Sequence, residues 1–126
     1  MSHILVIDDD SQVRLMLRKI LESEGYTVTD ASVGKEGIEC YRENQADLII
    51  TDIIMPEKEG IETIIELKKE YPDVKIIAMS GGGKISADNY LETAKIFGAS
   101  RIMEKPFTQQ AMVSIVKELL EDDLST

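Results

Sequence analysis

The sequence has little of several residue types, and each shortage excludes a class of protein. Cys40 is the only cysteine and His3 the only histidine among 126 residues. A single cysteine cannot form a disulfide within the chain, which favours a reducing, cytoplasmic environment. One histidine and one cysteine are too few for an ordinary zinc site. No Ser–His or Cys–His pair of the kind used in nucleophilic catalysis falls near a shared strand end.

Basic residues and long apolar runs are scarce as well. Fourteen Lys and Arg face 24 Asp and Glu, giving a formal charge of −10. This balance argues against binding to nucleic-acid phosphates or to anionic membranes. The apolar run at residues 4–7 is too short for a signal peptide or a membrane span, and it leads directly into three aspartates. We therefore expect a cytoplasmic protein without nucleic-acid or membrane partners.

Two hydrophobic periodicities alternate along the chain, which predicts one α/β domain over residues 1–126 with no output domain. Short apolar runs predict five strands, and apolar residues at helical spacing predict five helices between and after them. Strands are expected near residues 3–7, 26–31, 47–51, 74–79 and 101–104, and helices over residues 11–24, 35–44, 61–71, 87–97 and after Thr108. Such alternation predicts a parallel sheet covered by helices on both faces.

Polar residues stand where the predicted strands end. Asp8 and Asp9 follow the first strand, Asp52 the third, Ser80 the fourth and Lys105 the fifth. In the common strand order 2-1-3-4-5 these strand ends are neighbours, and ligands bind at the carboxyl edge of such sheets. The sequence therefore predicts one pocket with three carboxylates, one hydroxyl and one ammonium.

The chemistry of this pocket indicates a metal-assisted phosphoryl site. Three carboxylates in close contact must either take up protons or be neutralised by a cation. Oxygen ligands suit Mg²⁺ or Mn²⁺, and Mg²⁺ binds through one or two carboxylates together with waters and phosphate oxygens. The Ser80 hydroxyl and the Lys105 ammonium are suitable partners for phosphoryl oxygens. A carboxylate in this setting is a candidate covalent acceptor, forming an acyl phosphate.

Five segments, each at its expected place, resemble the receiver domains of two-component response regulators. They are VIDDD (6–10), LIITDIIMPEKEG (48–60), AMSGG (78–82), FGAS (97–100) and KPF (105–107). The resemblance implies a flavodoxin-like (βα)5 three-layer sandwich. It also implies a signalling switch that accepts a phosphoryl group from a sensor histidine kinase or a phosphotransfer protein and regulates another protein. Such a domain catalyses only its own phosphorylation and dephosphorylation.

The resemblance also implies a role for each matching residue. Asp52 is the expected phosphoacceptor, and Asp9 the expected direct ligand of Mg²⁺. Asp8 would bind the metal through water or hold the site in register, and the backbone carbonyl of Ile54 would supply a further ligand. Lys105 would pair with the phosphoryl group.

Two further family features concern the switch. Ser80 occupies the switch position whose hydroxyl moves toward the phosphoryl group, and the Lys105–Pro106 bond is often cis in the family. The sequence departs from the family pattern at Ile102, where an aromatic switch residue is common. It also departs in the stretch from Ser80 to Gly98, which is a few residues longer than usual and rich in glycine.

Other interpretations of the same residues remain open or fail on particular positions. A Mg²⁺-dependent aspartyl-phosphate phosphohydrolase needs a second aspartate two residues after the nucleophile, where Ile54 stands. A flavin or nucleotide module needs a glycine-rich turn after the first strand, where this chain has three aspartates. A Walker A loop at 81–84 fails at Ala78 and Ile85. A degenerate receiver that is never phosphorylated remains an alternative.

Some notable residues have ordinary structural interpretations. Asp10 is expected to act as an N-cap or a solvated loop residue. The methionines at positions 16, 79, 103 and 112 fall on apolar periodicities, so we expect them to pack in the core.

Overall fold

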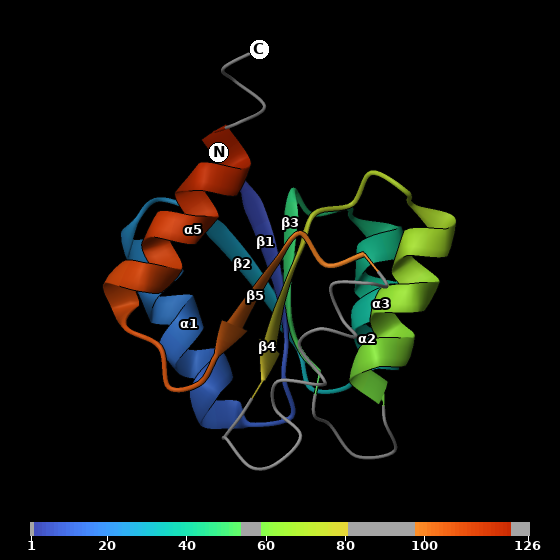
Figure 1. The fold of residues 1–126 in the computed structure, drawn as a ribbon, viewed down its shortest axis with the longest axis horizontal. Helices are drawn as coiled ribbons and strands as arrows, with labels where there is room; N and C mark the ends of the chain where they lie inside the picture. The colour runs from blue at the N-terminus through green and yellow to red at the C-terminus, as the bar shows by residue number, and fades with distance from the viewer. Residues whose placement is uncertain (1, 54–58, 81–97, 122–126) are drawn as a thin grey trace.

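The computed structural model describes residues 2–53, 59–80 and 98–121, and these form a parallel sheet between two layers of helices (Figure 1). The strand order is β2-β1-β3-β4-β5, as predicted. The elements are β1 (His3–Ile7), α1 (Ser11–Ser23), β2 (Thr27–Ala31), α2 (Gly34–Glu43), β3 (Leu48–Asp52), α3 (Glu59–Glu70), β4 (Ile76–Ser80), β5 (Arg101–Glu104) and α5 (Gln109–Glu121). The helix predicted over 87–97 lies outside the described residues.

The sheet separates two hydrophobic clusters, because successive side chains of a strand point to opposite faces. Helices α1 and α5 cover one face, while α2 and α3 cover the other (Figure 1). Ile4, Val6 and Ile50 point into the first cluster, and Leu5 and Ile49 into the second. All five residues of β3 and of β4 are buried. Burial on both faces explains why these strands consist of continuous apolar runs.

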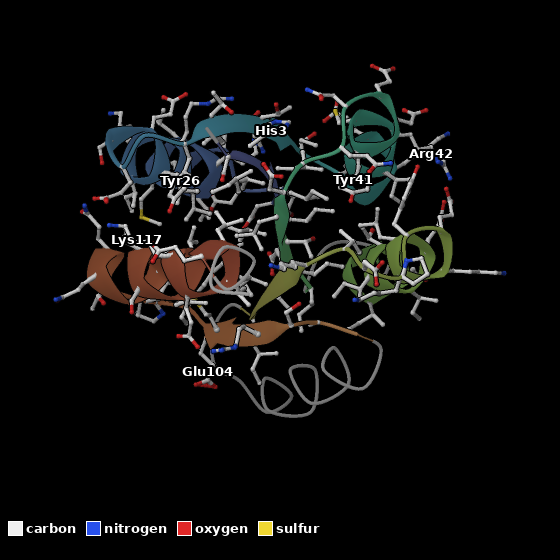
Figure 2. All side chains as sticks on the ribbon, turned by 90° about the horizontal axis from the view of Figure 1, so that it is seen from above. His3, Tyr26, Tyr41, Arg42, Glu104 and Lys117 are labelled. Carbon is white, nitrogen blue, oxygen red and sulfur yellow. The ribbon has the colours of Figure 1, made fainter. Side chains whose placement is uncertain are left out.

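Ion pairs on the surface join the two helices of each layer. Arg42 of α2 donates to Glu66 at 3.1 Å and to Glu70 of α3, and Lys117 of α5 lies 3.1 Å from Glu24 just after α1 (Figure 2). Exposed pairs of this kind contribute little to stability individually. The packing of the two clusters therefore determines how the helices sit on the sheet.

The expected N-cap of the first helix is confirmed, and one expected core residue is not. Asp10 caps α1, because its Oδ1 accepts from Gln12 N at 2.8 Å. The methionines at 79, 103 and 112 are buried as predicted, whereas Met16 is 41% exposed. The inner face of α1 is formed by Leu17, Ile20 and Leu21. Met16 precedes Leu17, and one residue rotates a side chain about 100° around the helix axis.

The first turn of α3 packs directly on the backbone that follows β3. A Cβ atom placed on Gly60 would overlap the Cα, carbonyl carbon and oxygen of Ile53. We expect Gly60→Ala to lower the free energy of unfolding by about 3 kcal/mol, because the backbone must shift to relieve the overlap. Urea unfolding followed by circular dichroism measures this loss.

Gly25→Ala is the matched control for the Gly60 substitution. Gly25 has a φ of +96° and nothing within 4 Å of an added Cβ. Its substitution strains only the local backbone and should cost about 1 kcal/mol. Equal losses for the two variants would show that the contact between α3 and Ile53 is not a tight one.

Candidate functional site

The strand-end residues meet at the carboxyl edge of the sheet, as the topology predicted. Backbone hydrogen bonds continue the strand pairing to this edge. Asp8 N donates to Ala31 O at 3.1 Å, Ile53 N to Met79 O at 2.9 Å and Lys105 N to Ser80 O at 2.7 Å. These bonds hold the ends of neighbouring strands at one level, so their side chains share a single pocket.

Three carboxylates form the acidic part of the pocket. Asp8, Asp9 and Asp52 each offer an oxygen, and these oxygens lie within 4.8 Å of one another. Asp8 is fully buried, Asp52 is 4% exposed and Asp9 is exposed. An all-oxygen donor set of this spacing, partly open to solvent, fits a hard divalent cation that retains water ligands. The residues present therefore suit Mg²⁺.

Lys105 supplies a positive charge inside the same pocket. Its Nζ donates to Asp8 Oδ2 at 2.8 Å and lies 3.4 Å from Asp52 Oδ2. Burial lowers the pKa of Lys105, but the hydrogen bonds and charges of Asp8 and Asp52 outweigh burial and raise the pKa above its ordinary value. The stability linked to this raised pKa is therefore fully present below the ordinary lysine pKa, and it is lost as the pH rises through the higher pKa of Lys105 in the folded state.

Hydrogen bonds fix both the carboxylate and the backbone carbonyl of Asp8. Its Oδ1 accepts from Asp10 N at 2.9 Å, while its Oδ2 accepts from Lys105. Its backbone carbonyl accepts from Arg14 Nη1 at 2.7 Å. The sequence interpretation missed Arg14. An available signal was an arginine one turn into a helix that begins at an acidic loop.

Ser80 places a buried hydroxyl at the end of β4. Its Oγ is inaccessible to solvent and has no hydrogen-bond partner within residues 2–53, 59–80 and 98–121. A buried hydroxyl without a partner is costly, so this atom is suited to meet a ligand or a moving group. Ile102 is partly buried and packs on the cluster beneath α2 and α3.

The remaining predictions concern the Lys105–Pro106 bond, Ile54 and the segment after Ser80. The Lys105–Pro106 bond is cis, as the resemblance implied. Ile54, the expected source of a backbone ligand, lies outside the described residues, as does the glycine-rich segment after Ser80.

A parallel sheet of this order, with polar side chains gathered at its carboxyl edge, places the protein in the flavodoxin-like class of α/β domains, which bind their ligands at that edge. Within that class, the sequence pattern of the response regulator receiver domain matches residues 4–117, and the chain belongs to this family. Receiver domains act as phosphorylation-dependent signalling switches in two-component systems.

Individual relatives agree with this assignment. The chain is 35% identical over 117 residues to the chemotaxis protein CheY of Thermotoga maritima, covering 92% of this chain and 95% of that protein. It is 34% identical to the sensor kinase CckA of Brucella abortus, covering 94% of this chain but only 12% of the kinase. A receiver domain structure from Clostridium thermocellum has a TM-score of 0.87 and 32% identity, with 98% and 97% of the two chains covered.

Within the described part of the chain, no helix is both long enough and apolar enough to span a bilayer.

Proposed function

We propose that Asp52 accepts a phosphoryl group from the phosphohistidine of a sensor kinase or phosphotransfer protein, with Mg²⁺ in the acidic pocket. The observation that carries this proposal is the Lys105 ammonium between two buried carboxylates, with three carboxylate oxygens within 4.8 Å. Asp8 has both carboxylate oxygens hydrogen-bonded, and Asp9 is exposed. Asp52 is buried beside the Lys105 ammonium, and it occupies the position that the resemblance to receiver domains assigns to the phosphoacceptor.

The proposed transfer forms a bond between an Asp52 carboxylate oxygen and phosphorus and breaks the phosphorus–nitrogen bond of the donor. Asp8, Asp9, Asp52 and the Ile54 carbonyl would hold Mg²⁺, which supplies positive charge for the phosphoryl oxygens. Lys105 would pair with a phosphoryl oxygen, and the Ser80 hydroxyl would donate to another. In the metal-free pocket Lys105 offsets the charges of Asp8 and Asp52. In the phosphorylated pocket, Lys105 and the metal would together offset the charge of the phosphoryl group.

An apolar groove beside the site supports docking of the protein that donates the phosphoryl group. It is lined by residues of α1, of the segment before α5 and of the first turn of α5, namely Ser11, Gln12, Leu15, Met16, Lys19, Ile20, Phe107 and Gln109. Leu15 is 52% and Met16 41% exposed, so two large apolar side chains are grouped on the wall of this groove. Ser11 and Phe107 each follow a site residue, Asp9 and Lys105, by two positions. A partner bound here would reach the pocket.

We infer a cytoplasmic switch over residues 1–126 that contacts a histidine kinase or phosphotransfer protein and a downstream protein, without nucleic acid or membrane. Phosphorylation would be read through Ser80 and the segment that follows it. In this proposal the chain catalyses only its own phosphorylation and dephosphorylation.

Metal removal provides the direct test. After incubation with acetyl phosphate and MgCl₂, intact-mass measurement should show one added phosphoryl group per chain. With EDTA in place of MgCl₂ the mass should remain unchanged, because the pocket then lacks the charge that offsets its carboxylates. MnCl₂ should replace MgCl₂, since both are hard cations with oxygen ligands. An unchanged mass in MgCl₂ would favour the degenerate receiver instead.

A further inference from the structure

The Arg14 side chain binds a backbone carbonyl of the acidic loop, not one of the loop's carboxylates. The loop between β1 and α1 consists of Asp8, Asp9 and Asp10. Arg14 lies one turn into α1, where its backbone N donates to Asp10 O at 3.1 Å. Its side chain turns back, and Nη1 donates to the carbonyl oxygen of Asp8 at 2.7 Å. A partly buried guanidinium thereby ties the helix to the loop.

The Asp8 carbonyl is mechanically linked to Asp9. A peptide unit is planar, so the carbonyl of Asp8 and the N–H of Asp9 move as one rigid group. The Asp8 carboxylate has anchors of its own, in Asp10 N and Lys105. The Asp9 side chain begins at the Cα that ends this peptide unit, and one of its oxygens lies in the acidic cluster. Fixing the Asp8–Asp9 peptide therefore fixes the point from which the Asp9 carboxylate reaches the pocket.

We propose that Arg14 is a positioning residue for the divalent cation site, and that its hydrogen bond to the Asp8 carbonyl increases the affinity for Mg²⁺. This inference rests on the proposed function of the pocket. Two effects of the side chain oppose each other. Its positive charge repels a cation, while its hydrogen bond orders the loop that supplies the ligands. The guanidinium is partly exposed and its charge is screened by solvent, so the ordering effect should dominate.

Arg18 offers a matched control on the same helix. Its Nη1 donates to a backbone carbonyl, that of Val28 in β2, at 2.9 Å. It also pairs with Glu22 and Asp30. Arg18 therefore makes the same kind of contact as Arg14, from one turn further along α1, but holds β2 instead of the acidic loop. Replacing either arginine removes one positive charge and one hydrogen bond to a backbone carbonyl, and replacing Arg18 also breaks its two ion pairs.

The experiment titrates MgCl₂ into the wild type and the variants Arg14→Met, Arg14→Lys and Arg18→Met, with amide chemical shifts as the readout. Arg14→Met should weaken Mg²⁺ binding by roughly tenfold or more, the usual effect of losing a group that orients a metal ligand. Arg14→Lys retains a charged donor and should recover most of the affinity. Arg18→Met should bind Mg²⁺ like the wild type. Thermal unfolding without Mg²⁺ separates general destabilisation from the specific effect.

The outcomes distinguish this proposal from the function on which it rests. Mg²⁺ binding by Arg14→Met that equals or exceeds that of Arg18→Met would overturn the role of Arg14, since charge repulsion would then be the larger effect. A wild type without saturable Mg²⁺ binding would overturn the proposed function and this proposal with it. If Arg14→Met does not fold, the Mg²⁺ affinities of Arg14→Gln and Arg18→Gln are compared in its place. The same two outcomes would then overturn the proposal.

Discussion

Asp52→Asn is expected to abolish phosphoryl uptake from acetyl phosphate. The amide oxygen and nitrogen of asparagine replace the carboxylate without changing its shape, so the pocket retains its geometry but loses its nucleophile. Intact-mass measurement in MgCl₂ should show one added phosphoryl group on the wild type and none on the variant. The physical basis is that the acyl phosphate forms only on an ionised carboxylate, and that Asp52 is a buried acid at the end of β3, 3.4 Å from the Lys105 ammonium.

The same substitution should increase stability in the absence of metal. The carboxylate oxygens of Asp8, Asp9 and Asp52 lie within 4.8 Å of one another, and Lys105 is the cation that contacts two of these acids. Removing one of the negative charges relieves repulsion that is only weakly screened at buried positions. We expect the free energy of unfolding to rise by about 1–2 kcal/mol in EDTA. Urea titrations with and without MgCl₂ measure this, and the stabilisation by Mg²⁺ should be smaller in the variant.

Asp10→Asn serves as the control for both measurements. Asp10 lies in the same acidic loop, but its side chain caps α1, and asparagine caps helices about as well as aspartate. This variant should still take up one phosphoryl group. Phosphoryl uptake by Asp52→Asn at the wild-type level would place the acceptor at another residue and contradict the proposed role of Asp52.

The strand-end pocket could be predicted from the sequence because parallel topology brings strand ends together. Each apolar run marks a strand, and the residue after it falls at the carboxyl edge whatever the details of packing. Asp52 at the end of the wholly buried strand β3 is an example. The distances within the pocket could not be predicted. That Lys105 lies closer to Asp8 than to Asp52 depends on how β5 and β1 are placed on either side of β3 and β4.

Met16 and Arg14 differ from the expectation for different physical reasons. Helical periodicity predicts Met16 in the core because it does not resolve the margins of an apolar stripe, and one position separates Met16 from the buried Leu17. Arg14 was missed because its partner is a backbone carbonyl, which every residue has and no side-chain pattern marks. Contacts to the backbone become apparent only when the fold brings the two groups together.

Lys105→Met is expected to impair both stability and phosphoryl transfer. In the absence of metal the substitution leaves Asp8 and Asp52, with side chains 0% and 6% exposed, without the ammonium that contacts both. Removing one partner of a buried ion pair typically costs about 3–5 kcal/mol. Urea unfolding in EDTA measures this loss.

Mg²⁺ should restore much of the stability of Lys105→Met but not its phosphoryl uptake. The cation replaces the lost positive charge beside the carboxylates, so the gain in melting temperature on adding MgCl₂ should exceed that of the wild type. The phosphoryl oxygen that Lys105 would contact remains unpaired, and uptake should slow by roughly a hundredfold or more. Lys75→Met is the control, because Lys75 Nζ donates to Leu119 O at 2.7 Å, away from the pocket. If Lys105→Met takes up the phosphoryl group at a rate close to that of Lys75→Met, the Lys105 ammonium has no part in the transfer. It would then serve only to offset the carboxylate charges of the pocket when no metal is bound.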